Sequence, residues 1–194
     1  MDKPSEAELI NWVLQGKVNY FRPLIEAHQE LAYRMAYRLM GQADLAQEMT
    51  QEAMVKAFQK LHQFRGDASF ATWLGRIVTT TCLGYLRKEK RRPEQIEWQG
   101  QDVQVEPKGQ QRLEDADQNQ AIQEALTALS PKERLVLQMF YLDEMKVDEI
   151  HQQTGISKSN VKVLLHRGRK NFKTYFHPEN VQALTQEHGN QTRP

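Results

Sequence analysis

The stretch DEIHQQTGISKSNVKVLLHRGRKNFK, residues 148–173, decides the fold of the C-terminal half of the chain. A short helical pattern ends at Gly155, and Ser157 then stands where a capping residue would begin a second, longer helix. Val161, Leu164 and Leu165 recur at the spacing that buries one face of a helix. Two helices joined by a tight turn that contains glycine predict a helix-turn-helix unit.

The second of these helices carries an unusual charge pattern. Six Lys or Arg residues and no acid lie between Lys158 and Lys173, whereas surface helices usually mix both signs. A plain solvated basic face is the alternative, but the turn and the cap favour binding to the major groove of duplex DNA, with base contacts near the helix start and phosphate contacts farther along. The expected DNA-binding residues are Ser157, Lys158, Ser159, Asn160, Lys162, Val163, His166, Arg167, Arg169 and Lys170.

A single unit of this kind binds DNA weakly. With about four phosphate contacts, its affinity would fall with salt at a log–log slope of about −3.6. No run of heptads that would support a dimer is visible in the sequence. Specific binding therefore needs help from the N-terminal half of the chain or from a partner.

The remaining periodic segments also read as helices, which predicts an all-α fold. A capping box at Ser5 begins the first helix, and three further helices are expected over about 19–41, 44–64 and 70–92. In the helix expected over 44–64, Met54, Phe58 and Leu61 are expected to face inward. Helical rhythm resumes at Gln118, and Ser130-Pro-Lys-Glu is a second capping box, with proline at the first helical position.

Charge and composition divide the chain. Residues 93–117 hold seven acids against two bases, with interspersed glutamines and helix breakers, and this predicts a flexible acidic linker. We expect one helical domain at 1–92, a second at 118–176 and a polar tail at 177–194. The net charge of +1 hides two basic clusters, one at 87–92 and the other at 158–173.

The first basic cluster ends the segment TWLGRIVTTTCLGYLRKEKRR, residues 72–92. Three successive threonines weaken a helix, so a role other than filling the core is suggested, although a core helix with a basic end remains open. Short hydroxyl side chains and arginines suit single-stranded nucleic acid, and the loop 64–69 could receive an extruded base.

Two sets of motifs resemble the extracytoplasmic-function (ECF) sigma factors of the sigma-70 family. FRGDASFATWLGRI at 64–77, YLR at 85–87 and AQEMTQEAMVKAF at 46–58 resemble sigma region two. Residues 126–134, 148–157, 160–162 and 166–169 resemble region four. The resemblance covers about 20–92 and 118–175 in the family's order. It implies a dissociable initiation subunit of bacterial RNA polymerase, active in stress response.

The resemblance also implies roles for particular residues. The first domain would bind the clamp helices of the β′ subunit and melt the −10 element, and the second would read the duplex −35 element on the β flap. The implied −10 residues are Arg65, Asp67, Ser69, Thr72, Trp73, Arg76, Thr79, Thr80, Arg87 and Lys88. The implied polymerase-binding residues are Glu48, Gln51, Glu52, Val55 and Gln59, whose alternative is plain solvated surface. Thr80, Gly84 and Asn160 depart from common family residues, which leaves base preference open.

Other classes of function fit less well. A stand-alone helix-turn-helix regulator would need a dimer interface or ligand pocket, and neither is visible. The six histidines lack metal-ligand spacing and no Gly-rich phosphate loop is present, so we expect a non-enzyme without metal or cofactor. One cysteine, Cys82, and no long apolar run indicate a cytoplasmic protein with no membrane insertion. The resemblance further implies an anti-sigma partner.

Overall fold

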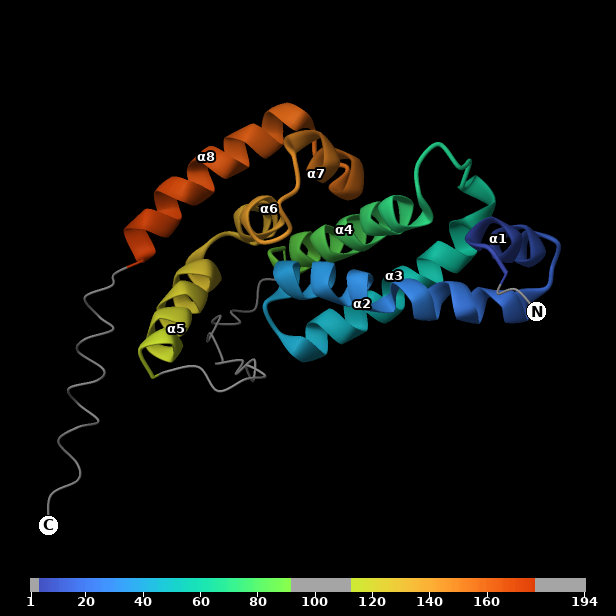
Figure 1. The fold of residues 1–194 in the computed structure, drawn as a ribbon, viewed down its shortest axis with the longest axis horizontal. Helices are drawn as coiled ribbons and strands as arrows, with labels where there is room; N and C mark the ends of the chain where they lie inside the picture. Colours follow the sequence, from blue (N-terminus) through green and yellow to red (C-terminus); the bar gives the residue numbers. More distant parts are fainter. Residues whose placement is uncertain (1–3, 92–112, 177–194) are drawn as a thin grey trace, which may run out of the picture.

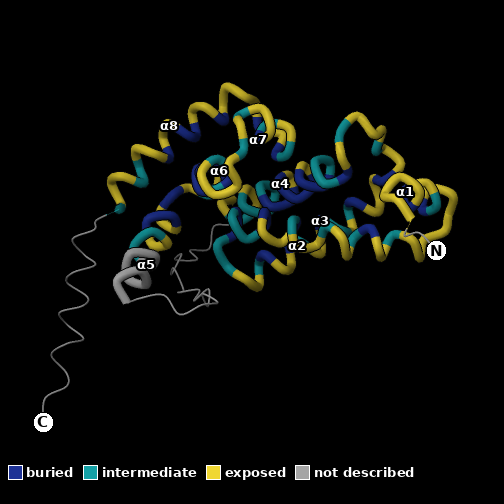
Figure 2. The backbone as a smooth tube through the Cα atoms, in the orientation of Figure 1, coloured by how far each residue is buried: buried dark blue, intermediate teal, exposed yellow. Residues whose placement is uncertain are grey.

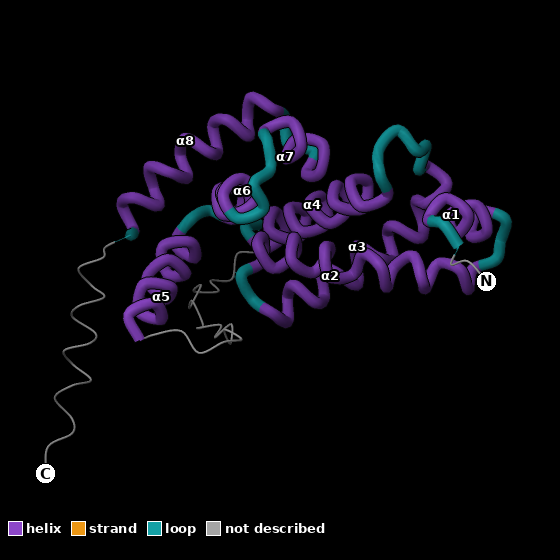
Figure 3. Tube along the Cα trace, viewed as in Figure 1, coloured by secondary structure: helices purple, strands orange, loops and turns teal. Residues whose placement is uncertain are grey.

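The computed structural model describes residues 4–91 and 113–176, and over these ranges the protein consists of helices and loops with no strand (Figure 3). This confirms the all-α prediction. The N-terminal half contains α1 (Glu6–Leu14), the 3₁₀ turn η1 (Val18–Tyr20), α2 (Phe21–Met40), α3 (Ala43–Lys60), η2 (Leu61–Gln63) and α4 (Phe70–Glu89). The C-terminal half contains α5 (Leu113–Ala128), α6 (Pro131–Tyr141), α7 (Val147–Thr154) and α8 (Lys158–Tyr175).

Serine caps fix the starts of four helices. The Ser5 hydroxyl accepts from the backbone N–H of Glu8, and the Glu8 carboxylate accepts from Ser5 in return, as the capping box predicts. Ser130 and Glu133 form the second predicted box at α6. Ser69 and Ser157 cap α4 and α8 through the backbone N–H of the third helical residue. Local sequence therefore sets where these helices begin.

The core of the N-terminal half lies between α2, α3 and α4, and α1 packs against α2 (Figure 1). Fully buried methionines and leucines of α2 face small alanines on α3, which lets the helix axes approach closely. One expectation was wrong. Phe58 is 40% exposed, because it lies beside the alanine stripe of α3 and its ring reaches Phe21 only edge-on, at 5.0 Å between centroids.

In the C-terminal half, α8 packs along α6 and α7, and α5 lies near the far end of α8 (Figure 1). Gly168 permits close contact between α8 and α6, because a methyl group there would lie 2.9 Å from Leu137 Cδ1. Helix α5 begins at Leu113, whereas the sequence predicted that helix would resume at Gln118. The earlier start is possible because no glycine or proline lies between Gly109 and Ala128. Residues 93–112 of the expected linker lie outside the described residues.

The two halves pack directly against each other, which the sequence did not predict. Helix α6 contacts α2, and α7 contacts α4 (Figure 1). Arg134 is only 8% exposed and donates from Nε to the carbonyl oxygen of Arg38 at 2.7 Å and from Nη2 to that of Leu39 at 3.2 Å. These carbonyls end α2, where a cation also meets the negative end of the helix dipole.

An ion pair joins the same two surfaces. Arg38 donates through both terminal nitrogens to Asp143, which follows α6, with Nη2 to Oδ1 at 2.8 Å. The hydrogen bond from Arg38 lowers the pKa of Asp143 below its ordinary value. The ion pair therefore stabilises the packing above about pH 4, and that contribution fades as the pH falls through the lowered pKa.

Candidate nucleic-acid interface

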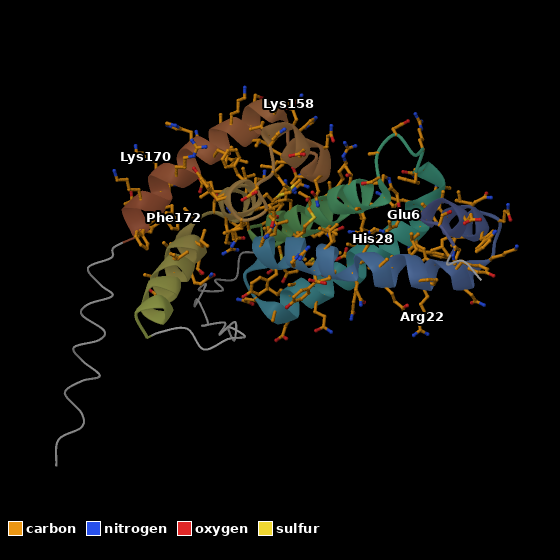
Figure 4. All side chains as sticks on the ribbon, viewed as in Figure 1. Glu6, Arg22, His28, Lys158, Lys170 and Phe172 are labelled. Carbon is orange, nitrogen blue, oxygen red and sulfur yellow. The ribbon has the colours of Figure 1, made fainter. Side chains whose placement is uncertain are left out.

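The outward face of α8 is basic and exposed. All ten residues predicted to bind duplex DNA are exposed, and most of them lie along the outer side of the helix (Figure 2). Lys158 and Lys170 point away from the molecule, whereas Phe172 packs inward (Figure 4). Lys162, His166 and Lys170 follow one another at intervals of four, so they share the centre of this face. We call the outer side of α8 that carries these three residues the α8 face.

The turn before α8 is held by its own hydrogen bonds. Gly155 adopts φ of 73°, the left-handed conformation that ends α7. A ring nitrogen of His151, Nδ1, lies 2.7 Å from the carbonyl oxygen of Ile156. Lys158 pairs with Asp148 at 3.0 Å, which ties the start of α8 to the start of α7. The first turn of α8 is thereby fixed relative to α7.

Arg169 has an additional contact on α6. Its guanidinium carbon lies 5.6 Å from the ring centroid of Phe140 and 5.8 Å from that of Tyr141. These are cation–π distances, and they hold the side chain against α6. Arg169 remains exposed, so it is available to a phosphate, but its removal would also affect packing.

An aromatic cluster holds the loop that precedes α4. Phe64 and Phe70 stand at the two ends of residues 65–69, and their rings meet edge-to-face with centroids 5.9 Å apart. Trp73 packs against both, at 5.5 Å from each centroid. Arg65, Asp67 and Ser69 of this loop are exposed, and Gly66 adopts φ of 78°. The loop is therefore anchored at its base and open to solvent at its tip.

On helix α4, some residues of the predicted −10 set are exposed, and others are half-buried or buried. Thr80, Arg87 and Lys88 are exposed, and the Thr80 hydroxyl donates to the carbonyl oxygen of Arg76 at 2.9 Å. Thr79 was expected on the surface but is 1% exposed. It lies one turn beyond Gly75, on the face of α4 that meets Gln153 of α7 and Met35 of α2. Arg76 donates from Nε to the carbonyl oxygen of Gln152 in α7, at 2.6 Å.

The predicted polymerase-binding residues form a continuous exposed strip on α3. Glu48, Gln51, Glu52, Val55 and Gln59 are all exposed, and Glu52 pairs with Lys56 at 2.6 Å. Sequence reasoning missed Phe58 as a member of this surface. Its position three residues after Val55 could have suggested it, because residues at that spacing are neighbours on one helix face.

Cys82 is buried in α4, and burial raises the pKa of its thiol to about 12. At pH 8 only on the order of one thiol in 10⁴ would be ionised, and the thiolate is the reactive form. We expect no reaction with a thiol-specific disulfide reagent in the native protein, and one equivalent of reaction in urea. The absorbance of the released thiol gives the measurement. Rapid native reaction would contradict the burial.

The described ranges were also searched for metal-ion sites and membrane-spanning helices. Among residues 4–91 and 113–176, no three His, Cys, Asp or Glu side chains gather where they could hold a metal ion. No helix in those ranges has the length and apolar character needed to cross a bilayer.

Comparisons with known proteins agree with the geometry. The family model of sigma-70 region 2 matches residues 24–92, and that of sigma-70 region 4 matches residues 119–172. The ECF RNA polymerase sigma factor SigW of Bacillus subtilis is 26% identical over 170 residues, which cover 83% of this chain and 91% of SigW. The ECF RNA polymerase sigma factor SigE of Mycolicibacterium smegmatis is 29% identical over 154 residues, which cover 78% of this chain and 60% of SigE.

Two solved structures share the fold. The sigma factor RpoE of Bartonella quintana, solved with the anti-sigma factor NepR, has a TM-score of 0.60 and 18% identity, covering 80% of this chain and 95% of RpoE. CnrH, solved with the cytosolic domain of CnrY, has a TM-score of 0.56 and 21% identity, covering 87% of this chain and 95% of CnrH.

Proposed function

The chain belongs to the ECF sigma factors of the sigma-70 family, alternative sigma factors that initiate transcription, and from this premise we propose that its two halves divide promoter recognition. The half at residues 1–92 binds core RNA polymerase and the −10 element. The half at residues 118–176 reads the −35 element. The alternative of a stand-alone regulator is not favoured, since two regions of the same family match in their usual order.

The −35 assignment is carried by one observation: the α8 face is exposed and contains no acid. In this proposal α8 enters the major groove, and residues 157–162 meet base edges because the helix start enters first. Arg167, Arg169 and Lys170 lie farther along and bind phosphates. The positive charge supplies most of the binding energy and makes it sensitive to salt.

The −10 assignment rests on the exposed loop 65–69 and on two basic residues near the end of α4, Arg87 and Lys88. A base extruded from the duplex needs a pocket that can receive it, and strand separation needs cations along the displaced backbone. The loop supplies Arg65 and Asp67, whose side chains can hydrogen-bond to a base edge. Arg87 and Lys88 supply charge near the other end of α4.

Polymerase supplies the affinity that each half lacks. When one scaffold holds both halves, the second contact forms at high effective concentration, so weak modules bind tightly together. The strip on α3 that contains Glu52 faces the clamp helices of β′, and the C-terminal half sits on the β flap. The protein is an initiation factor, and we infer that it performs no catalysis of its own and works in the cytoplasm. An anti-sigma factor is an expected partner, since the similar sigma factor RpoE was solved in complex with the anti-sigma factor NepR.

Transcription by core polymerase tests the function. Core enzyme is incubated with genomic DNA from the source organism, with and without this chain, and new start sites are mapped. We expect a defined set of new start sites, with shared sequences near −10 and −35. No new transcripts would refute the proposal. A gel shift without polymerase separates the alternative, since tight, specific binding by the free chain would favour a stand-alone regulator.

The proposed polymerase-binding strip on α3 can be tested by substitution. The double substitution Gln51→Ala with Glu52→Ala should weaken binding to core polymerase roughly tenfold, as loss of about 1.4 kcal/mol would produce. Fluorescence anisotropy of the labelled chain gives the dissociation constant. The matched control is Gln29→Ala with Glu30→Ala, an exposed Gln–Glu pair on α2. Equal losses in the two variants would show that α3 has no special role.

A further inference from the structure

An exposed valine lies in the middle of the basic α8 face. Val163 is 44% exposed, whereas Val161 and Leu165, close to it in sequence, are 0% and 4% exposed and belong to the buried stripe. Val163 follows Ser159 by four residues and precedes His166 by three, so these three side chains are neighbours on one side of the helix. An apolar side chain therefore stands on the side of α8 that is turned away from the core.

The stability of the helix does not account for valine at this position. A β-branched residue lowers helix stability relative to alanine, lysine or arginine, because its side chain loses rotamer freedom against the preceding turn. Val163 also buries little area within the chain, since nearly half of its surface reaches solvent. Apart from Tyr175 near the far end, the other large apolar residues of α8 are buried or half-buried (Figure 2). The contribution of Val163 therefore lies in what α8 binds.

Val163 lies close enough to the start of α8 to reach a base edge. At about 1.5 Å per residue, it stands about 7.5 Å along the helix axis from Lys158. The major groove of B-DNA is about 12 Å wide, so a helix whose first turn enters the groove carries this position in with it. Arg167 and Lys170, which we assign to phosphates, stand about 6 Å and about 10 Å farther on. Val163 therefore lies between the polar residues of the helix start and the cations that bind the backbone.

The chemistry of valine limits what it can contact in the groove. Its two methyl groups neither donate nor accept a hydrogen bond, so they gain nothing from a phosphate or from a polar base edge. In the major groove, guanine, cytosine and adenine present donors and acceptors, and thymine alone adds an apolar group, its C5 methyl. Contact between valine and that methyl removes apolar surface of both from water. Against cytosine, the same valine would displace water from the N4 amino group without replacing its hydrogen bond, which is unfavourable.

We propose that Val163 is a specificity-determining residue that contacts the C5 methyl of one thymine in the −35 element and disfavours cytosine at that position. This inference rests on the proposed −35 role of α8. The lysines of the α8 face bind DNA of any sequence, because phosphates carry no sequence information. Val163 carries no charge, so it affects which promoters are bound and leaves the salt dependence of binding unchanged.

The test removes one methyl group from the DNA and, separately, the two methyl groups from the protein. In a −35 duplex taken from a promoter identified by start-site mapping, deoxyuridine replaces each thymidine in turn on either strand, which deletes only the C5 methyl. Val163→Ala removes the proposed partner, and alanine favours the helix more than valine does, so α8 should stay folded. Holoenzyme with the wild-type chain and holoenzyme with Val163→Ala are each titrated with every labelled duplex.

The expected result is a response to uracil at one thymine. There, uracil should weaken binding by the wild-type holoenzyme about fourfold, as loss of one buried methyl group would give. The same replacement should change binding by Val163→Ala less than about 1.5-fold, since the partner is already absent. Cytosine at that position should weaken wild-type binding roughly tenfold. The salt slope of Val163→Ala should equal that of the wild type, because no phosphate contact is lost.

The matched control is Val18→Ala. It makes the same chemical change at a residue of η1 that is 53% exposed and lies outside α8. Holoenzyme with Val18→Ala should keep the full response to uracil. If Val18→Ala loses that response as Val163→Ala does, the loss does not come from a contact at position 163, and the inference is refuted.

The remaining outcomes separate this inference from the proposed function. If no thymine on either strand responds to uracil, or if Val163→Ala responds as strongly as the wild type, the thymine contact is refuted while the −35 role of α8 stands. A shared −35 sequence without thymine on either strand would refute it equally. If Lys162→Ala with Lys170→Ala also binds the duplex as tightly as the wild type, the −35 role of α8 fails, and the inference with it.

Discussion

Phe70→Ala should lower the free energy of unfolding of the N-terminal half by about 3–5 kcal/mol, the cost of removing a fully buried aromatic side chain. Phe70 is 0% exposed, and its ring packs against His28, Phe64 and Trp73. The cavity would open at the base of the loop 65–69. Urea unfolding followed by tryptophan fluorescence gives the measurement, and one of the three tryptophans, Trp73, lies beside the cavity.

Two controls define this result. Phe70→Leu keeps most of the buried area and should cost less than about 1.5 kcal/mol. Phe58→Ala makes the same chemical change at a site that is 40% exposed and should cost far less than Phe70→Ala. If Phe70→Ala and Phe58→Ala destabilise the protein equally, the aromatic cluster is not the centre of the N-terminal core. Loss of promoter opening without loss of stability would assign Phe70 to DNA instead.

The double substitution Lys162→Ala with Lys170→Ala should weaken binding of the holoenzyme to a −35 duplex about thirtyfold, if each lysine contributes about 1 kcal/mol through a phosphate. Both lysines lie on the α8 face and are exposed. The slope of log affinity against log salt should also become shallower by about 1.8, because two fewer counterions are released. Titration of labelled duplex across a salt series gives both quantities.

The matched control for this pair is Lys132→Ala with Lys146→Ala. It removes the same charge from exposed positions of the C-terminal half that lie off α8. The control should leave the salt slope within about 0.5 of the wild-type value, since no phosphate contact is lost. Equal slopes for the two double variants would mean that net charge, and not the α8 face, governs binding. Binding to core polymerase should be unchanged in both.

Much of the fold follows from local sequence. Ser5, Ser130 and Ser157 mark helix starts because a serine side chain satisfies backbone donors that the helix leaves unpaired. Gly155 marks the turn, because its backbone is left-handed there. The exposure of the nine predicted residues on α8 likewise follows from helical periodicity, since the opposite stripe is apolar and buried.

The contact between halves could not be predicted in this way. A periodic apolar stripe indicates that a face is buried, but not which helix covers it. Gly75 reads in the sequence as a weak position in a helix, and only the approach of Gln153 shows what it permits. The burial of Thr79 and Arg134 could not be predicted for the same reason. Sequence analysis assigns a polar residue to the surface unless its distant partner is known.

The contacts of Arg169 bear on the energetics of its proposed role at the −35 element. An arginine that is free in solution must give up many rotamers when it meets a phosphate, whereas this guanidinium already rests on Phe140 and Tyr141. Part of the entropic cost is thus met during folding, before any DNA arrives. Lysine would keep the charge but lose the flat stacking surface, so the two residues are not equivalent at this position.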